Sequence, residues 1–310
     1  MIRGFVFALL TSFTVFAASA ESYTTKELMK YYRMDEPREG RGAISEDLAI
    51  KVLPPPPPPF IGVLPPQTDP LMKKLISLMS DAEIDHVVKN ATAKLNDYWT
   101  SVFRAQGKVF PPASVSVYTS SKGDNEVGSY FDPEKGKNGR IFIDRREERE
   151  NPWIESTSAA INADVAHEMG HYVVNVLNIE WRATKKAKSN RGLCSRQELN
   201  TSPVQVCIEL QADFLAGISL KGSELLYKGN PEEIYYNAAG QGDDFEEVTG
   251  NARLSIQHGA FTHGTGKDRA ALIYEGMQTG DVHKGLSYLG TTPDWNRLQK
   301  IPKKKQPRRR

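Results

Sequence analysis

The sequence predicts an α+β fold that is mostly helical and contains a small antiparallel sheet. Two long apolar segments, at about 156–177 and 203–222, have the length of helices, and an earlier segment shows apolar residues at helical spacing. Residues 115–144 contain three short strand-like runs separated by Gly and Asn. With 310 residues and 39% hydrophobic content, the chain can form a substantial core as one large domain or two small ones.

The first 20 residues have the pattern of a signal peptide. Arg3 supplies a positive start, residues 5–16 are mostly apolar, and residues 18–20 (Ala-Ser-Ala) resemble a cleavage site. The alternative is an uncleaved membrane anchor, although the run is shorter than the roughly 20 apolar residues that span a bilayer. We therefore expect an exported protein, periplasmic or secreted, which is membrane-associated only if the signal is retained.

Residues 21–70 are expected to form a proline-rich, poorly ordered linker. Charged stretches precede a run of six prolines at 54–59, and such a run favours polyproline II. This composition favours a spacer, and a docking ligand for a proline-binding module is the alternative.

The folded domain is expected to span residues 71–290. From Leu71 to about Arg104 the apolar spacing predicts two successive helices, the second beginning near Asp81. Strand-like runs follow, and their members are residues 115–118, 126–131 and 140–144. We expect these three runs to pair as an antiparallel sheet.

The second half of the domain is predicted to be helical. The segment 156–177 is apolar on nearly all sides, which is typical of a central, buried helix. Residues 185–191 are basic and polar, so we expect an exposed loop there. Pro203 suits the first turn of the next helix, and residues 231–289 predict further helices separated by glycine-rich loops.

The last residues, 291–310, are expected to form a basic, disordered tail. They end in two clusters of Lys and Arg separated by a proline. A weak contact with anionic lipid or cell wall through this tail is one interpretation of the charge.

Two polar motifs interrupt the apolar helices. Residues 167–171 read His-Glu-Met-Gly-His, and residues 209–213 read Glu-Leu-Gln-Ala-Asp. Residues four apart lie on one face of a helix, so both imidazoles of the first motif are directed to one point. Burying such groups unpaired costs on the order of several kcal/mol per charge. A divalent cation between the helices satisfies both motifs, and direct hydrogen bonding between them is the alternative. Gly170 suggests that another backbone passes close by.

Two His and one Glu that leave a fourth position open form the ligand set of a catalytic zinc site. We therefore expect His167, His171 and Glu209 to bind one Zn²⁺ ion. Glu168 cannot reach the same coordination point, and it is placed to take a proton from the attacking water and pass it to the leaving amine. Asp213, one turn after Glu209, is expected to accept the remaining N–H of a ligating histidine.

The two cysteines of the chain, Cys194 and Cys207, permit two interpretations. One disulfide fits an exported chain and would brace Glu209, which lies two residues after Cys207. Two buried thiols are the alternative, and the sequence leaves both open.

At this point the sequence resembles the bacterial neutral zinc metallopeptidases of the gluzincin kind. The resemblance covers roughly residues 70–285 and rests on four blocks in order, which are 167–171, 209–217, 237–244 and 263–281. It implies a zincin-like metallopeptidase domain of α+β class, with zinc held by the three residues named above. The chain departs from the family pattern at Asp268 and Leu272, which puts substrate preference in doubt.

The resemblance also directs attention to two further residues. His263 is a candidate catalytic residue that could donate a hydrogen bond to the oxyanion. Arg269 could bind a substrate carboxylate or brace its own loop. By analogy with sheets that bind an extended peptide at an edge strand, Tyr130 is a candidate substrate-binding residue. A purely structural role for His263 and Arg269 is the alternative.

Taken together, the motifs predict an exported zinc-dependent metallopeptidase whose partner is a protein or peptide substrate. Hydrolysis of a cell-wall amide, and a non-catalytic scaffold or binding role, are the alternatives. The formal net charge of +2 gives no signature of nucleic-acid binding, so no nucleic-acid partner is expected.

Overall fold

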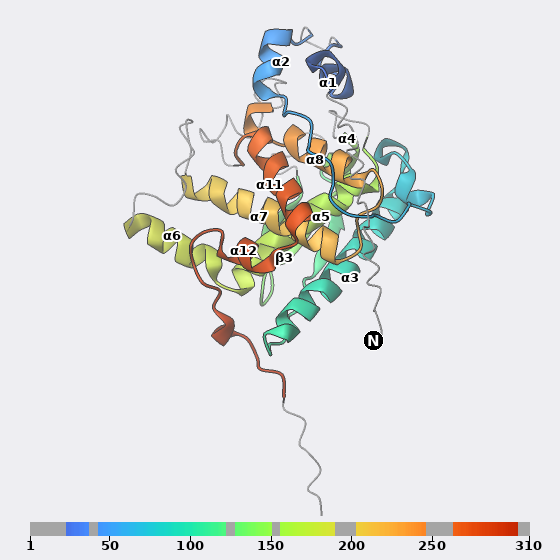
Figure 1. Ribbon diagram of the computed structural model, residues 1–310. Coiled ribbons are helices and arrows are strands. Elements are labelled where there is room, and N and C mark those ends of the chain that lie inside the picture. Colours follow the sequence, from blue (N-terminus) through green and yellow to red (C-terminus); the bar gives the residue numbers. More distant parts are fainter. Residues whose placement is uncertain are drawn as a thin grey trace, which may run out of the picture.

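The computed structural model describes residues 23–36, 43–121, 128–150, 156–189, 203–245 and 263–302 (Figure 1). The signal-peptide prediction for residues 1–20 lies outside these residues, as do residues 303–310 of the basic tail. Within the described residues, the helices and strands in chain order are α1 (Thr25–Tyr31), α2 (Glu46–Val52), α3 (Asp81–Ala105), β1 (Val115–Tyr118), β2 (Tyr130–Asp132), β3 (Arg140–Asp144), α4 (Arg145–Glu150), α5 (Ser158–Val176), α6 (Ile179–Ser189), α7 (Pro203–Gly222), α8 (Asn230–Gly240), α11 (Gly266–Thr279) and α12 (Val282–Ser287).

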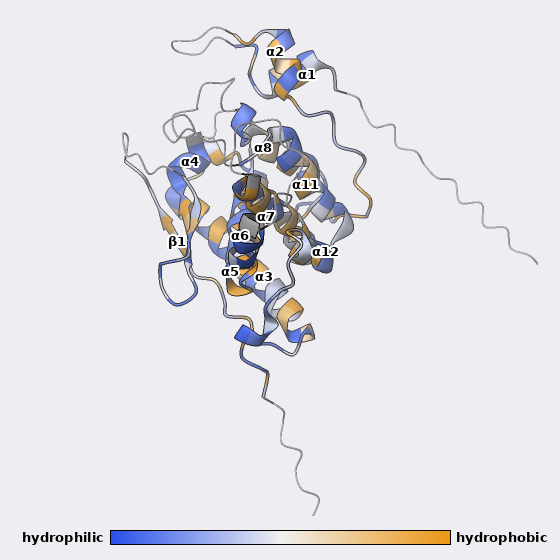
Figure 2. Ribbon diagram, turned by 90° about the vertical axis from the view of Figure 1, so that its left-hand side faces the viewer, coloured by the Kyte–Doolittle hydropathy of each residue, from blue (hydrophilic) through white to orange (hydrophobic). Residues whose placement is uncertain are grey.

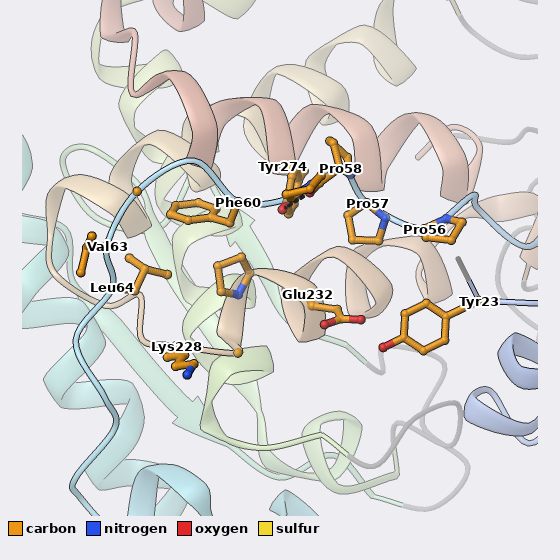
Figure 3. A pocket seen from close by; sticks show the side chains of 14 residues that line it. Tyr23, Pro56, Pro57, Pro58, Phe60, Val63, Leu64, Lys228, Glu232 and Tyr274 are labelled. Carbon is orange, nitrogen blue, oxygen red and sulfur yellow. Dashed lines mark hydrogen bonds between the residues drawn. The ribbon is translucent and has the colours of Figure 1, made fainter. Parts of the chain in front are cut away.

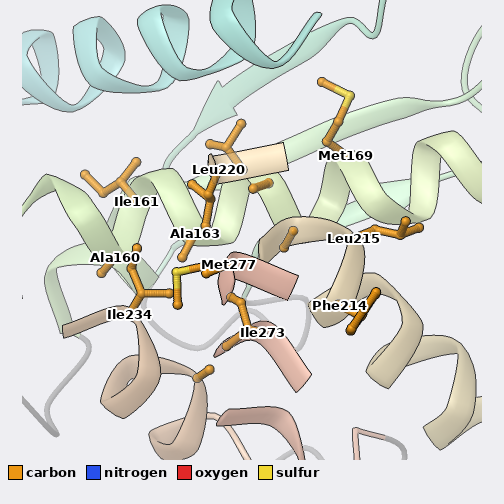
Figure 4. Close-up of a cluster of buried hydrophobic side chains, with 14 of the residues drawn as sticks. Ala160, Ile161, Ala163, Met169, Phe214, Leu215, Leu220, Ile234, Ile273 and Met277 are labelled. Carbon is orange, nitrogen blue, oxygen red and sulfur yellow. The ribbon is translucent and has the colours of Figure 1, made fainter. Parts of the chain in front are cut away.

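Helix α5 lies at the centre of the helical body. It is buried on nearly all sides, as its apolar sequence predicts. Helices α3, α7 and α8 pack against it, and α11 packs against α7 and α8. Side chains of α5, α7, α8 and α11 share one hydrophobic cluster, of which Figure 4 labels Ala160, Met169, Phe214, Ile234 and Ile273.

The small sheet is mixed, so the prediction of an antiparallel sheet is wrong for one of its two pairings. The strand order is β1-β3-β2, in which β2 pairs with β3 antiparallel and β1 pairs with β3 parallel. A short turn joins β2 to β3, which makes that pair antiparallel. Strands β1 and β2 are consecutive in the chain but lie on opposite edges of the sheet with β3 between them, and β1 runs parallel to β3.

Helix α3 begins where the sequence predicts, but the helix expected before it is absent. Two 3₁₀ turns, Leu71–Lys73 and Ile76–Leu78, stand in its place. A capping box then starts α3, because Ser80 and Glu83 each bond the backbone of the other. The loop expected at 185–191 is also wrong in its first residues, since α6 continues to Ser189.

Two parts of residues 21–70, around 25–34 and 45–53, are folded, unlike the poorly ordered linker expected there. Helices α1 and α2 form a small unit beside the main body (Figure 2). Tyr32 is fully buried, and its hydroxyl donates to the carbonyl of Tyr236 on α8 at 2.8 Å. The charged composition masked a short apolar face that packs on the body, formed by Leu28, Met29, Tyr32, Met34, Ala49 and Val52.

Residues 291–302 also differ from the expected disordered tail. The Trp295 ring packs edge-on against Phe103 of α3, with ring centroids 5.1 Å apart. The backbone amide of Asp294 donates to the carbonyl of Leu177 at 3.0 Å. The folded body therefore extends past residue 290, to at least residue 302. Among the described helices, none combines the length and apolar character that crossing a bilayer requires.

Candidate metal centre

Three donor atoms from two helices form a nearly equilateral triangle. The Nε2 atoms of His167 and His171 on α5 are 3.1 Å apart, and they lie 3.3 Å and 3.1 Å from Oε2 of Glu209 on α7. His167 and Glu209 are only 8% and 6% exposed. Among the described residues, these three form the one group of histidine, cysteine and acidic side chains whose donor atoms lie close enough together to share an ion.

The size of this triangle fits a tetrahedral zinc ion. Ligand atoms about 2.0–2.1 Å from a tetrahedral zinc lie about 3.3 Å from one another, which is close to the observed edges. Two imidazole nitrogens and a carboxylate oxygen that face one point also need a cation or protons between them. The donor set is that of a catalytic zinc site, and three protein ligands leave a fourth position for water or substrate.

The close approach of α5 and α7 brings the two motifs together. A Cβ atom at Gly170 would lie 2.9 Å from the carbonyl oxygen of Ala212 and 3.0 Å from its Cα. Only glycine leaves room for this contact without a shift of one backbone. The predicted close passage of another backbone at Gly170 is therefore confirmed, and that backbone belongs to the helix that carries Glu209.

Asp213 lies against the ring of His167, one of the two histidines expected to have such an acceptor. The Nδ1–H of His167 donates to Oδ1 of Asp213 at 2.8 Å, which directs the Nε2 atom of the same ring toward the triangle. Burial alone raises the pKa of Asp213, but the charges of Arg269 and His167 outweigh it and hold that pKa below its usual value. Asp213 is therefore a carboxylate and an acceptor.

Arg269 braces this carboxylate, a role that differs from the two expected for it, which were binding a substrate carboxylate and bracing its own loop. Its Nε and Nη2 atoms donate to the two oxygens of Asp213 at 3.0 Å and 3.1 Å, and Nη1 donates to the carbonyl of Gln241 at 2.9 Å. The residue is 4% exposed. Because all three guanidinium nitrogens are bonded within the protein, the geometry does not favour the expected contact with a substrate carboxylate.

Three further residues, Gln205, Gln241 and Asp164, support this site. The side-chain amide of Gln205 donates to Oε1 of Glu209 at 2.9 Å and leaves Oε2 for the triangle. The amide of Gln241 donates to Asp164 on α5 at 2.9 Å, so α5, the end of α8 and α11 are joined by one network. The four-residue spacing of Gln205 and Glu209 signals the first contact, whereas nothing local in the sequence signals the contact between Gln241 and Asp164.

Glu168 lies beside the triangle on the same helix and is 7% exposed. Burial raises its pKa, and the neighbouring charges of His167 and His171 only partly oppose this effect. A carboxylate with a raised pKa is a stronger base, which suits a group that must accept a proton near neutral pH. The expected role of Glu168 as general base stays a prediction that this environment favours.

The charges of the three triangle residues act on one another. Burial lowers the pKa of His167, but the charge of Asp213 and the hydrogen bonds of Asp213 and Glu209 raise it to about 10. Burial raises the pKa of Glu209, and the charge of His171 with the bonds from both histidines brings it well below its usual value. The carboxylate is thus ionised, and a cation that binds here must displace protons from the imidazoles.

His263 stands at the start of the chain segment that enters α11, and its side chain is 47% exposed. Its backbone N–H and that of Gly264 donate to Oδ2 of Asp243, at 2.8 Å and 2.7 Å. The other oxygen of Asp243 lies 3.4 Å from Nδ1 of His263. Asp243 thus contacts both the backbone and the ring of His263.

Two remaining predictions concern residues outside this network. Tyr130 is on β2, an edge strand of the sheet, where its ring stacks on Phe142 with centroids 4.9 Å apart. It is 39% exposed, and its role in substrate binding stays a prediction. Cys207 on α7 is disulfide-bonded, whereas Cys194, the other cysteine of the chain, lies outside the described residues.

The comparisons with known proteins agree with this geometry. Residues 63–288 match the family described as "Putative neutral zinc metallopeptidase". The chain belongs to this family. Two curated relatives, each named "Uncharacterized protein YpfJ", come from Escherichia coli strain K12 and from E. coli O6:H1 strain CFT073.

Each relative is 26% identical over 206 residues, which cover 61% of this chain and 66% of the relative. The chain thus spans slightly less than two thirds of the length of these relatives. No solved structure matches. Family membership and the mostly helical body with its small sheet confirm the predicted zincin-like α+β class.

Proposed function

We propose that this chain is an exported zinc-dependent metallopeptidase that hydrolyses peptide bonds with Glu168 as general base. The observation that carries the proposal is the triangle of His167, His171 and Glu209, with edges of 3.1–3.3 Å, beside the buried carboxyl group of Glu168. A non-catalytic zinc fold has no use for a base at that position. Membership of a metallopeptidase family supports the same conclusion.

A bound zinc ion supplies Lewis-acid chemistry, because it polarises a carbonyl group and lowers the pKa of water. Glu168 accepts the proton of the attacking water, and its raised pKa suits that transfer. The same carboxyl group then delivers the proton to the leaving amine. Asp213, braced by Arg269, keeps the ring of His167 oriented throughout.

His263 is assigned to the oxyanion of the tetrahedral intermediate. Asp243 faces its Nδ1 atom at 3.4 Å, so the Nε2 atom on the opposite side of the ring is the donor in this assignment. The half-exposed side chain is accessible to a substrate. The raised pKa of His263 favours the protonated ring: burial lowers this pKa, and the hydrogen bond to Asp243 and the charge of Glu209 outweigh the effect of burial.

Export is the further part of the proposal. It is supported by the positive start, apolar run and small-residue site of residues 1–20. N-terminal sequencing of the chain recovered from the periplasm or medium of its bacterial host tests it. A mature chain that begins at or near Glu21 supports export with cleavage, and a chain that keeps Met1 contradicts it.

The activity is tested by hydrolysis of unfolded casein with the chain before and after treatment with a chelator. We expect chelation to abolish hydrolysis and added zinc to restore it. Glu168→Gln should lower the rate by about 10²-fold or more while zinc still binds. His86→Gln, which changes an exposed histidine on α3, is the matched control and should retain full activity.

Hydrolysis that is unchanged in Glu168→Gln contradicts the mechanism even if zinc is present. A parallel assay with peptidoglycan separates the alternative substrate class. Release of fragments from peptidoglycan, with casein left intact, would redirect the proposal to a cell-wall amide.

A further inference from the structure

The proline run lies across α8 and α11 as a strap, here defined as residues 54–61 (Figure 3). Proline fixes φ and lacks an N–H, so a run of six prolines is held extended and offers only carbonyl oxygens for hydrogen bonding. Three of these carbonyls accept bonds from side chains of the two helices. The strap is therefore bound at defined points.

The donors are two tyrosines and a glutamine. The hydroxyl of Tyr235 on α8 donates to Pro55 O at 2.7 Å, and the hydroxyl of Tyr274 on α11 donates to Pro58 O at 2.6 Å. The side-chain amide of Gln278, also on α11, donates to Pro59 O at 3.0 Å and accepts from the backbone N–H of Ile61 at 2.8 Å. Gln278 thus pairs with the strap at two points.

The spacing of these bonds matches a polyproline II helix. That helix has three residues per turn, so the carbonyls of Pro55 and Pro58 point to the same side. Tyr235 and Tyr274, whose ring centroids are 5.5 Å apart, meet this side from adjacent helices. The ring of Phe60 then packs edge-on against Tyr274 at 6.3 Å, and this contact fixes the end of the run (Figure 3).

One side of the strap is bonded to the helices, and the strap as a whole is not buried. A cavity of about 680 Å³ runs beside it, lined by Pro56–Phe60 on one side and by Lys228, Pro231 and Glu232 on the other. Ile61 is 79% exposed, and Val63, just past the strap, is 100% exposed. Contacts of this kind, in which aromatic and amide side chains bond the carbonyls of a preformed helix, are those by which proline-rich ligands are recognised.

We propose that Tyr235, Tyr274 and Gln278 form a polyproline II-binding groove and that the strap is its tethered ligand. The ligand class is a proline-rich peptide in which an aromatic residue follows the last proline. The occupant in the native chain is the strap itself, at an effective concentration in the millimolar range because it is tethered. A separate peptide of this class therefore binds only when the strap is released. This inference is independent of the proposed peptidase activity.

The first test measures hydrogen exchange at the backbone amide of Ile61 in the full-length chain. Tyr274→Phe and Tyr235→Phe do not touch this amide, yet each should speed its exchange about fivefold, because each removes one of the bonds that hold the strap as a unit. The matched control is Tyr172→Phe, which removes an equivalent bond from a tyrosine hydroxyl to Pro111 O, at 2.7 Å, away from the groove. The control should leave the exchange of Ile61 unchanged.

The second test supplies the ligand in trans. The protein is the full-length chain with Pro55→Gly, Pro56→Ser, Pro57→Gly and Pro58→Ser, which removes the polyproline preference and keeps the strap length. The probe is a labelled peptide of residues 53–62. We expect saturable binding to this variant, no binding to the parent chain, and binding roughly 25-fold weaker when Tyr274→Phe and Gln278→Ala are added. A Gly-Ser peptide of equal length is the control and should not bind.

Two results overturn the proposal. If the amide of Ile61 stays as protected in the proline-substituted chain as in the parent, the groove does not recognise the polyproline conformation. If that amide is released and the peptide still shows no saturable binding, the groove is not a site for ligands of this class.

Discussion

The pairing of Asp213 with Arg269 predicts two separable effects of the substitution Asp213→Ala. The first is on folding: Arg269, 4% exposed, would keep its charge without its partner. Removing one partner of a buried ion pair leaves the other charge uncompensated, and this lowers the free energy of unfolding by about 3–5 kcal/mol. The second is on metal binding: the ring of His167 would lose the acceptor, at 2.8 Å, that orients it. Loss of such a contact weakens metal affinity by about 10- to 100-fold.

The double variant Asp213→Ala, Arg269→Met separates these effects. Removing both charges leaves no unpaired ion, so the double variant should be more stable than Asp213→Ala alone by about 2 kcal/mol. Its zinc affinity should stay low, because the acceptor for His167 is still missing. Unfolding of the metal-free chain in urea measures the first quantity, and competition against a chromogenic chelator measures the second.

A second bidentate pair provides the control. Arg145 donates to the two oxygens of Asp85 at 2.7 Å and 2.9 Å, but these side chains are 17% and 27% exposed, against 5% and 1% for Arg269 and Asp213. Asp85→Ala should therefore cost only about 1 kcal/mol and leave zinc affinity unchanged. The reasoning is refuted if the double variant regains zinc affinity, or if it is no more stable than Asp213→Ala.

Three further outcomes follow from the same site. Gly170→Ala should lower the free energy of unfolding, measured in urea, by about 1–3 kcal/mol, because the new Cβ would lie 2.9 Å from the carbonyl oxygen of Ala212. A variant as stable as the parent chain, or more stable, contradicts this prediction. The pKa of His167 is raised to about 10 and that of His171 is also raised, so protons compete with zinc for both imidazoles. Zinc affinity should therefore fall at least about tenfold per pH unit between pH 8.5 and 6.5, and an affinity that does not change with pH would contradict this reasoning. If casein is hydrolysed, Asp243→Asn should lower kcat about tenfold, because His263 loses its charged partner, and should leave zinc affinity unchanged. A change in zinc affinity without a change in kcat would assign Asp243 a structural role.

The metal centre was predictable because most of its information is local. The spacing of His167 and His171 fixes a shared helix face whatever the rest of the chain does. Gly170 signalled a close backbone, and the structure identifies it as that of Ala212. Asp213 followed from its position one turn after Glu209. The inferences about the histidines and Asp213 use the period of one helix and the cost of burying a polar group, and the inference about Gly170 uses the cost of glycine within a helix.

The remaining parts of the site depend on contacts between segments that are distant in sequence. Asp243 holds His263 across 20 residues, and Gln241 reaches Asp164 across 77 residues. The spacing of residues within one helix or strand gives no information about pairs so far apart in the sequence. The charged composition of the N-terminal segment predicted a poorly ordered linker. It gave no indication that Tyr32 is buried or that the proline run is bound.

Helix α7 packs closely against α5 and α11 because a glycine lies in each of the two contacts. On one side Gly170 of α5 lets the backbone of Ala212 approach, and on the other Gly217 faces Gly276 of α11 so closely that a Cβ at either would overlap backbone atoms. Because α7 carries Glu209 and Asp213, both contacts set the geometry of the triangle. Side chains between these helices would allow several spacings, whereas backbone contact allows one. The two glycine contacts therefore fix α7 between α5 and α11, and the closer of them, at Gly217, lets α11 bring Arg269 within reach of Asp213.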